Sequence, residues 1–306
     1  MEALVDDYCG NCQMSNVELV WDCRCELGEG ALWNVHESSI YAVDIRGCAV
    51  LACKANGTVQ RRWDMPQRIG WLVSRRSGGW VAGFAQGVAS LDLHRDGTSQ
   101  IEWLHTLHEA NSPLRLNDAK VDGKGRLWFG TMNVVDNTRN ESVLYRLCPG
   151  GSPEVADAGY GVTNGPAFSP DGRTMYHTDT KARTIYAFDL NDDGSLSNKR
   201  VWVRLQTDEG LPDGMTTDAD GNVWVAHWGG ARVTQRDAQG GVIRIVPLPV
   251  PQVTSVAFGG PQMQDLYITT ARVGLQSTAL ADAPLSGGLF MLAAAGQGLA
   301  PNAFAD

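Results

Sequence analysis

Positive charge, long hydrophobic runs and helical periodicity are all scarce in this chain of 306 residues. It carries 25 Lys and Arg against 34 Asp and Glu, a net charge of −9 that is unfavourable for binding nucleic acid. No run approaches the roughly 18 apolar residues of a membrane-spanning helix. The acidic start, Met-Glu-Ala-Leu-Val-Asp-Asp, lacks the basic and apolar segments of a secretory signal. We therefore expect a cytoplasmic protein that contacts neither nucleic acid nor membrane.

Several catalytic and metal-binding motifs are also absent. The chain has no Gly-x-Ser-x-Gly, no Gly-x-x-x-x-Gly-Lys and no His-Glu-x-x-His. Among its seven cysteines, Cys9-Gly-Asn-Cys12 has the spacing of half a zinc ribbon, but Cys23-Arg-Cys25 has the wrong spacing for the second half. We interpret the cysteines as free thiols in a reducing compartment. Residues 1–15, which lack apolar periodicity, are expected to form a flexible tail.

Short strand-like runs, each with an aromatic residue, recur along the rest of the chain. They are Ser39–Asp44, Gly79–Gly83, Arg126–Thr131, Thr174–Thr178, Asn222–His227 and Asp265–Thr270. The aromatics stand at positions 41, 80, 128, 176, 224 and 267, and Asp-Gly or Gly-Gly turns precede most of the runs. Units of about 40 to 50 residues are typical of propeller blades. The sequence therefore predicts an all-β, six-bladed propeller of four-stranded blades, as a single domain over residues 16–306.

One polar position recurs in four of these units. Glu29 stands twelve residues before Tyr41 and Asn164 twelve before Tyr176, whereas Asn117 and Asp213 stand eleven before their aromatic residue. Radial symmetry points equivalent positions at one axis. Two carboxylates and two amides there would form an oxygen-rich site for a hard divalent cation. The sequence therefore predicts a metal site at one mouth of the channel.

A turn is the competing interpretation of this position, since Asn-Gly and Asp-Gly are common turn pairs. For Asn164 or Asp213 alone a turn would be the better explanation. Glu29, however, is no turn former, and the same offset in the other two units gives Arg68 or Ile69 and Ser255, which are poor metal ligands. Acidic and amide residues thus occur at this position in four units only, which a general turn requirement does not explain. We therefore favour a ligand set of Glu29, Asn117, Asn164 and Asp213.

Neighbouring polar residues are candidates for substrate binding. Arg115 and Asp118 flank Asn117 closely, and Asn133 follows the third strand run. A surface charge for Arg115 and a structural hydrogen bond for Asp118 are equally reasonable alternatives. A second group of side chains, which stands three residues after the strand aromatics, is expected to form hydrogen bonds between blades: Asp44, Asp179 and His227.

These phrases resemble those of the SMP-30/gluconolactonase/regucalcin family. The matching segments, in order over nearly the whole chain after residue 16, are Leu27-Gly-Glu29-Gly, Arg115-Leu-Asn117-Asp118, Gly130-Thr-Met132, Thr163-Asn164-Gly165 and Leu211-Pro-Asp213-Gly214. Ala167-Phe-Ser-Pro-Asp-Gly172 and Asn198-Lys-Arg200 are similar to the bacterial sugar-lactonase branch. The resemblance implies a six-bladed propeller that hydrolyses lactones with one divalent cation.

The same resemblance implies roles for individual residues. Glu29, Asn164 and Asp213 would bind the cation, Asn117 would be a ligand or a substrate contact, and Arg115 would hold the substrate. One departure follows Gly130-Thr-Met132, where Asn133-Val-Val-Asp136 replaces the acidic residues of some relatives. This difference leaves the sugar open among xylono-, arabinono-, galactono- and gluconolactone.

The leading hypothesis is therefore metal-dependent hydrolysis of a sugar lactone. Asp213 is the first choice for the general base and Asp118 the second. Calcium, magnesium, manganese, iron(II) and zinc all remain open as the cation, as does the oligomeric state. The alternatives are an organophosphate-hydrolysing propeller, a calcium-binding regulatory propeller without turnover, and a scaffold whose cation is structural.

Overall fold

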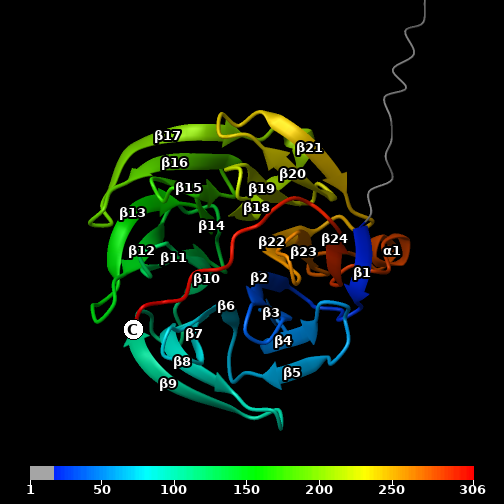
Figure 1. Ribbon diagram of the computed structural model, residues 1–306, viewed down its shortest axis with the longest axis horizontal. Coiled ribbons are helices and arrows are strands. Elements are labelled where there is room, and N and C mark those ends of the chain that lie inside the picture. Colours follow the sequence, from blue (N-terminus) through cyan, green and yellow to red (C-terminus); the bar gives the residue numbers. More distant parts are fainter. Residues whose placement is uncertain (1–16) are drawn as a thin grey trace, which may run out of the picture.

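The structure is a computed structural model that describes residues 17–306. The expected tail, residues 1–15, and the pair Cys9 and Cys12 lie outside the described residues. Within the described residues the strands form six antiparallel four-stranded sheets, which are arranged in a ring (Figure 1). This architecture confirms the six-bladed propeller that the recurring strand runs predicted.

Five blades are consecutive segments of the chain, and the first strand of each borders the central channel. Blade 1 contains β2 (Gly28–Asn34), β3 (Ser39–Asp44), β4 (Ala49–Lys54) and β5 (Arg61–Asp64). Blade 2 contains β6 (Ile69–Ser74), β7 (Trp80–Phe84), β8 (Gly87–Leu93) and β9 (Ser99–Thr106). Blade 3 contains β10 (Leu114–Val121), β11 (Leu127–Asn133), β12 (Ser142–Leu147) and β13 (Glu154–Tyr160).

Blades 4 and 5 follow the same order. Blade 4 contains β14 (Thr163–Phe168), β15 (Thr174–Asp179), β16 (Thr184–Leu190) and β17 (Leu196–Arg204). Blade 5 contains β18 (Leu211–Thr217), β19 (Val223–Trp228), β20 (Arg232–Arg236) and β21 (Val242–Pro247). Helical segments are short, as the sequence predicted: a 3-10 helix at Thr207–Glu209 and α1 at Ser277–Asp282.

Blade 6 is assembled from both ends of the chain. It contains β22 (Val253–Gly259), β23 (Asp265–Thr270) and β24 (Leu289–Leu292), and its outermost strand is β1 (Val17–Trp21). β1 pairs antiparallel with β24, for example Glu18 with Met291. This closure, which the sequence analysis did not predict, joins the first described strand to the last and seals the ring.

The hydrophobic core is divided among the interfaces between neighbouring blades. One cluster lies at each interface: Trp33 packs with Tyr267 between blades 6 and 1, and Trp128 packs with Phe188 between blades 3 and 4. Aromatic side chains bury large apolar areas, on the order of 150–250 Å² each. The strand aromatics of the repeat therefore hold the blades to one another.

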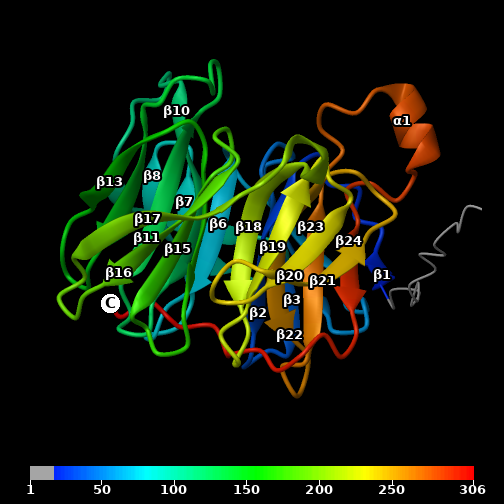
Figure 2. The ribbon, with the colours of Figure 1, turned by 90° about the horizontal axis from the view of Figure 1, so that it is seen from above.

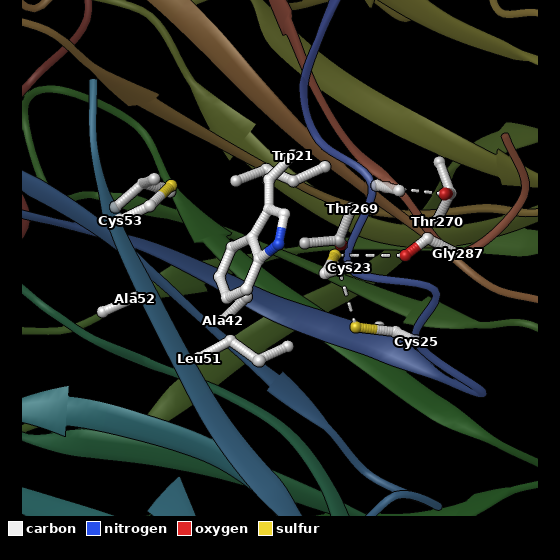
Figure 3. A pocket seen from close by; sticks show the side chains of 14 residues that line it. Trp21, Cys23, Cys25, Ala42, Leu51, Ala52, Cys53, Thr269, Thr270 and Gly287 are labelled. Carbon is white, nitrogen blue, oxygen red and sulfur yellow. Dashed lines mark hydrogen bonds between the residues drawn. The ribbon is translucent and has the colours of Figure 1, made fainter. Parts of the chain in front are cut away.

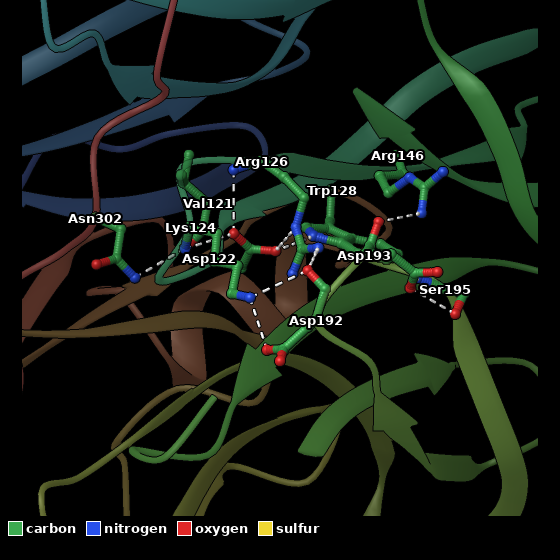
Figure 4. A network of polar contacts seen from close by, with 10 residues as sticks. All are labelled: Val121, Asp122, Lys124, Arg126, Trp128, Arg146, Asp192, Asp193, Ser195 and Asn302. Atoms are coloured by element: carbon green, nitrogen blue, oxygen red, sulfur yellow. Dashed lines mark hydrogen bonds and ion pairs between the residues drawn. The ribbon is translucent and has the colours of Figure 1, made fainter. Parts of the chain in front are cut away.

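A repeated aspartate–tryptophan contact stabilises the turn between the first two strands of blades 3 and 5. Trp128 donates its indole N–H to Asp122 at 2.9 Å, and Trp224 donates to Asp218 at 3.0 Å. The buried Asp122 also pairs with Arg126 at 2.6 Å, and Arg126 reaches the carbonyl oxygen of Asp192 in blade 4 (Figure 4). The turn signals of the repeat are thus also contacts between blades.

Asp44, Asp179 and His227, each three residues after a strand aromatic, were predicted to form hydrogen bonds between blades. They bond to the backbone of the segments that connect neighbouring blades. Asp44 accepts hydrogen bonds from the backbone N–H groups of Glu26 and Leu27, in the segment that crosses from blade 6 to blade 1. Asp179 accepts from the corresponding crossing between blades 3 and 4, and His227 bonds to the carbonyl of Glu209 at 2.8 Å.

The C-terminal segment crosses the centre of the ring on one face (Figure 1) and lies on the side opposite α1 (Figure 2). Its backbone is tied to blade 2 by the bond from Phe304 to the carbonyl of Ser74, 2.8 Å long. Asn302 donates to the carbonyl of Val121 at the end of β10. Among the described residues, no helix has both the length and the apolar character needed to cross a membrane.

Candidate metal and substrate site

The four recurrent polar residues all lie at β-bulges of innermost strands. In β2 the register shifts between Glu29 and Leu32. Glu29 pairs with Val43 and Leu32 with Tyr41, so three residues along β2 correspond to two along β3. The same shift occurs in β10, β14 and β18, at positions that include Asn117, Asn164 and Asp213 respectively. A bulge re-aims side chains that an unbroken strand would direct alternately to its two faces. The four blades therefore use one local device at equivalent positions.

Blades 2 and 6 have bulges too, but without an acidic or amide side chain. They fall between Ile69 and Trp71 and between Val253 and Ser255. The residues within them are Gly70 and Thr254, whereas the sequence offset gave Arg68 or Ile69 in blade 2 and Ser255 in blade 6. A Cβ atom on Gly70 would lie 2.7 Å from the carbonyl oxygen of Asn117. Blade 2 thus approaches Asn117 so closely that only glycine fits.

Hydrogen bonds from side chains fix the backbone immediately before three of the four recurrent polar residues, namely Glu29, Asn164 and Asp213. The carbonyl of Gly28, before Glu29, accepts from the hydroxyl of Thr254 at 2.6 Å. The carbonyl of Thr163, before Asn164, accepts from the amide nitrogen of Asn117 at 2.7 Å.

The third carbonyl, that of Pro212 before Asp213, accepts from the hydroxyl of Thr180 at 2.8 Å. In all three cases donor and acceptor belong to neighbouring blades. The spacing of the polar residues around the channel is therefore fixed by bonds between blades.

The two amides are also bonded to each other. Asn117 donates to Oδ1 of Asn164 at 2.9 Å, and Asn164 donates to the hydroxyl of Thr180 at 2.9 Å. Asn117 bonds through its amide nitrogen, so its carbonyl oxygen is the atom available to a cation or a substrate. Fixed amide oxygens are suitable ligands for hard cations.

Three buried carboxylates converge at this end of the channel: Glu29, Asp118 and Asp213, exposed by 7%, 4% and 4%. Burial raises the pKa of Glu29 to about 8, with a further contribution from the charge of Asp118. Burial also raises the pKa of Asp213 well above its usual value, and the charges of Glu29 and Asp118 add to the effect. Each of these carboxylates makes ionisation of the others less favourable, and a positive charge nearby would stabilise their ionised forms.

The donor set fits a cation. Oδ1 of Asp213 is buried and has no hydrogen-bond partner among the described residues, although buried polar atoms are nearly always bonded. No group of three or more His, Cys, Asp or Glu side chains in residues 17–306 is placed to hold a metal ion, so the carboxylates alone do not make a site. Amide oxygens would complete such a set, as expected for a hard divalent cation.

Asp118 is held more firmly than Asp213. Its Oδ1 accepts from the backbone N–H of Ala119 and its Oδ2 from that of Gly165, both at 2.8 Å. The second bond joins blade 3 to blade 4 beside Asn164. Burial is the main cause of the raised pKa of Asp118. Both oxygens of this carboxylate thus have a backbone donor, whereas Asp213 keeps an oxygen without one.

Two cationic side chains accompany the carboxylates. Burial lowers the pKa of Arg115 to about 10, against the opposing charge of Glu29, and its guanidinium donates to the carbonyl of Leu116 at 2.8 Å. Burial likewise lowers the pKa of Lys120, while Asp118 and Glu29 favour its charged form. Arg115 and Lys120 therefore balance part of the negative charge.

Lys120 lines the cavity that fills the rest of the channel, with a volume of about 360 Å³. Lys120 is surrounded by protein atoms, yet its side chain is only partly buried because the cavity is large enough to admit water beside it. It is the one titratable lining residue in the described part of the chain. Residues 299–302 border the same cavity, so the C-terminal segment lies at the end of the channel away from the bulges.

Asn133 has a different environment. Its Oδ1 accepts from the backbone N–H groups of Val135 and Asp136, each at 2.8 Å, and its amide nitrogen donates to Glu141. These bonds hold the loop after β11 and use both ends of the side chain. The structure therefore brings together Glu29, Arg115, Asn117, Asp118, Asn164 and Asp213, and gives Asn133 a role in its own loop.

The sequence reasoning missed Thr180, Thr254 and Lys120. The two threonines bond to backbone in a neighbouring blade, and no periodic signal marks such a partner. Lys120 stood within the Asn117-Asp-Ala-Lys phrase. Its position three residues after a recurrent polar residue, on an innermost strand, was the signal that could have identified it.

Fold and site together define a six-bladed propeller with an oxygen-rich polar site at one end of its channel. The chain belongs to the SMP-30/gluconolactonase family: residues 27–272 match the family described as SMP-30/Gluconolactonase/LRE-like region. Similarity to a solved luciferin-regenerating enzyme extends over 95% of this chain and 100% of that one, with a TM-score of 0.88 and 26% identity.

Characterised relatives match over most of their length. An L-arabinolactonase from Azospirillum brasilense is 35% identical over 290 residues, 94% of this chain and 95% of that protein. A regucalcin from Xenopus laevis is 33% identical over 298 residues, 94% and 98%. A pentonolactonase from Haloferax volcanii is 33% identical over 267 residues, 83% and 85%.

Proposed function

We propose that this protein hydrolyses a sugar lactone to the free aldonic acid with the help of one divalent cation. The observation that carries the proposal is the buried Oδ1 of Asp213, which has no partner among the described residues although Glu29, Asn117 and Asn164 surround the same end of the channel. The similarity to an L-arabinolactonase and a pentonolactonase supports a lactone as substrate.

Glu29, Asn164 and Asp213 would hold the cation, with Asn117 as a further ligand or a substrate contact. When bound, such a cation polarises a lactone carbonyl and makes a neighbouring water more acidic. Calcium, magnesium, manganese, iron(II) and zinc all accept oxygen ligands, with different preferences for geometry. The donor set of carboxylates and amides is best suited to the harder cations of this group.

Arg115 would bind the hydroxyl groups or the ring oxygen of the substrate. Its planar guanidinium presents several donors in a fixed arrangement, and burial beside Glu29 keeps it in place. A neutral, hydroxyl-rich lactone suits a pocket of arginine, amide and carboxylate groups. These residues would orient the lactone carbonyl toward the attacking water, which removes much of the entropic barrier.

Asp213 would act as general base. It takes a proton from the attacking water as the new carbon–oxygen bond forms, and the proton passes to the ring oxygen when the ester bond breaks. The product is the open-chain hydroxy acid. Asp118 is less suited, because backbone N–H groups already occupy both of its oxygens. We therefore assign Asp118 a positioning role, with Asp213 as the proton acceptor.

The test is a proton-release assay on purified protein with a panel of aldonolactones, with single metals added back after chelation. Asp213→Asn preserves shape but removes the charge, so we expect metal affinity and turnover both to fall, turnover by roughly a hundredfold or more even at saturating metal. Glu29→Gln should share the affinity defect but recover activity when metal is saturating. Native affinity and native turnover in Asp213→Asn would refute the mechanism.

The same assay separates the alternatives. Metal binding without turnover of any lactone would favour a calcium-binding regulatory protein, and regucalcin is among the relatives. Turnover of phosphotriesters in place of lactones would favour an organophosphate hydrolase. A melting temperature that collapses on chelation would favour a purely structural cation.

A further inference from the structure

Two thiols lie in contact at the start of blade 1. The sulfur of Cys25 donates to the sulfur of Cys23 across 3.5 Å, and Figure 3 shows the two side chains turned toward each other. Arg24 between them has a φ of 51°, in the left-handed region that non-glycine residues rarely adopt. The left-handed turn at Arg24 thus lies between two cysteines whose sulfur atoms are in contact.

The segment that carries the two thiols is anchored to one loop. The N–H of Cys25 donates to the carbonyl of Gly287 at 2.9 Å, and the thiol of Cys23 donates to the same carbonyl at 3.2 Å. Gly287 has a φ of 81°, and a Cβ atom there would lie 2.4 Å from the carbonyl oxygen of Cys25. The close approach requires glycine, so the pair is held by a fixed backbone contact.

The two sulfurs differ in accessibility and in acidity. Cys23 is half-buried and Cys25 is buried. The hydrogen bond from Cys25 lowers the pKa of the Cys23 thiol, whereas the pKa of the Cys25 thiol is raised well above its usual value by that hydrogen bond and by burial. By contrast, burial raises the pKa of Cys53 to about 12. Cys23 is therefore suited to react first, with Cys25 behind it.

A thiolate metal site is a poor alternative for this cluster. Cys53 lines the same pocket but lies across the ring of Trp21 from the other two sulfurs (Figure 3). Within residues 17–306 no three His, Cys, Asp or Glu side chains are placed to share a metal. Two sulfurs in contact without a third ligand are instead close enough to react with each other.

We propose that Cys23 and Cys25 form a peroxide-oxidisable dithiol that closes to an intramolecular disulfide. The Cys23 sulfur attacks one oxygen of a hydroperoxide, the O–O bond breaks, and the other oxygen leaves as an alcohol or as water. Cys23 is now a sulfenic acid. The Cys25 sulfur then displaces its hydroxyl group, which leaves as water with the proton of Cys25. The two thiols lose two electrons to the peroxide.

The dithiol lies beside the strand that carries Glu29. The Cβ atom of Cys25 is 3.1 Å from the position that a Cβ atom on Gly28 would take, so Cys25 packs on the residue before Glu29. This modification site is distinct from the proposed metal ligands, and it is independent of the proposed lactone hydrolysis.

The position of Arg24 makes the disulfide easy to identify. Trypsin cleaves after Arg24, and the next lysine or arginine is Arg46, so the two thiols fall on different peptides, residues 1–24 and 25–46. In a Cys9→Ser/Cys12→Ser chain each of these peptides contains one cysteine. After hydrogen peroxide treatment, alkylation and digestion, we expect the two peptides to be joined and to separate on reduction. Two separately alkylated peptides, or a sulfinic acid on Cys23 beside an alkylated Cys25, would overturn the proposal.

Single substitutions provide the controls. Cys25→Ser should leave a Cys23 sulfenic acid that dimedone captures, whereas Cys48→Ser, at another half-buried thiol, should leave the joined peptides unchanged. Should the double variant fold poorly, fragmentation of the joined peptides from the wild-type chain assigns the bonded sulfur. A bond from Cys9 or Cys12, instead of from Cys23, would then contradict the proposal.

Discussion

The hydroxyl of Thr254 donates a 2.6 Å hydrogen bond to the carbonyl oxygen of Gly28, the residue directly before Glu29. Thr254 belongs to blade 6 and Gly28 to blade 1, and Thr254 is the bulge residue of its own strand. The blade that lacks an acidic or amide side chain at its bulge therefore positions the proposed ligand of the next blade. Loss of a contact that orients a metal ligand typically lowers metal affinity by roughly 10- to 100-fold.

Thr254→Val should weaken metal binding roughly tenfold, because Gly28 and Glu29 lose the bond that fixes their backbone. Isothermal titration with the preferred metal measures the change. Thr217→Val is a matched control, since Thr217 donates a 2.7 Å bond to the carbonyl of Phe168 in the neighbouring blade, away from the ligands. Equal losses of affinity in the two variants would mean that the effect is general destabilisation.

Arg115→Lys should raise KM for the lactone, with a loss of kcat/KM of about tenfold or more, and leave metal affinity nearly unchanged. Lysine retains the positive charge beside Glu29 but lacks the planar set of donors. A hydrogen bond to a charged group contributes about 1.5–3 kcal/mol, which sets the size of the loss. Steady-state kinetics at saturating metal measures it. Wild-type kinetics in this variant would remove Arg115 from the substrate site.

Lys120→Met should tighten metal binding several-fold. The ammonium lies near Asp118 and Glu29, so its removal eliminates a positive charge that repels the cation, while methionine fills similar space in the cavity. Lys124→Met is the control, because Lys124 is exposed and pairs with Asp192 at the surface. Weaker binding in Lys120→Met would indicate that this lysine supports the site mainly through packing.

In the metal-free protein, Glu29 should make a contribution to stability that decreases as pH rises from about 4 to about 8. In this range the unfolded chain has released the proton of Glu29, whereas the folded protein retains it because burial raises the pKa to about 8. At this carboxylate the folded state binds more protons, so the contribution of Glu29 to the free energy of unfolding decreases with rising pH, whereas the buried His177 and His227, whose pKa values are lowered, contribute with the opposite sign. Melting temperatures across this range measure the slope.

Glu29→Gln isolates the contribution of this carboxylate. The change of stability with pH should be more positive in the variant than in the wild type over this range, because glutamine does not titrate. Saturating metal should also flatten the wild-type curve, since a bound cation favours the ionised form. Identical slopes in the wild type and the variant, both free of metal, would show that Glu29 titrates at its ordinary pKa.

The sequence predicted the propeller because its strands are local and repeated. Tyr41, Trp128 and Trp224 stand at regular intervals, and each packs into an interface between blades. The placement of Glu29, Asn117, Asn164 and Asp213 at equivalent bulges also follows from that regularity. The repeat period in the sequence is therefore enough to predict features that recur within every blade.

Features that depend on two distant segments could not be predicted in this way. The pairing of β1 with β24 joins segments more than 250 residues apart, and neither strand has a marker for the other. The offset in blade 6 pointed to Ser255, whereas the bulge residue is Thr254, because a bulge shifts the register by one residue. The bond from Thr180 to Pro212 likewise depends on how closely two blades approach.

The closure of the ring by β1 and β24 has a consequence for the order of folding. Synthesis proceeds from the N-terminus, so among the described strands β1 is the first to be made, whereas its partner β24 (Leu289–Leu292) is the last. Until then β1 has no partner strand and β23 has an open edge, and exposed strand edges of this kind favour aggregation. Closing such a long loop is slow relative to the formation of single blades. The pairing of β1 with β24 is therefore the step that commits the described strands to a closed ring.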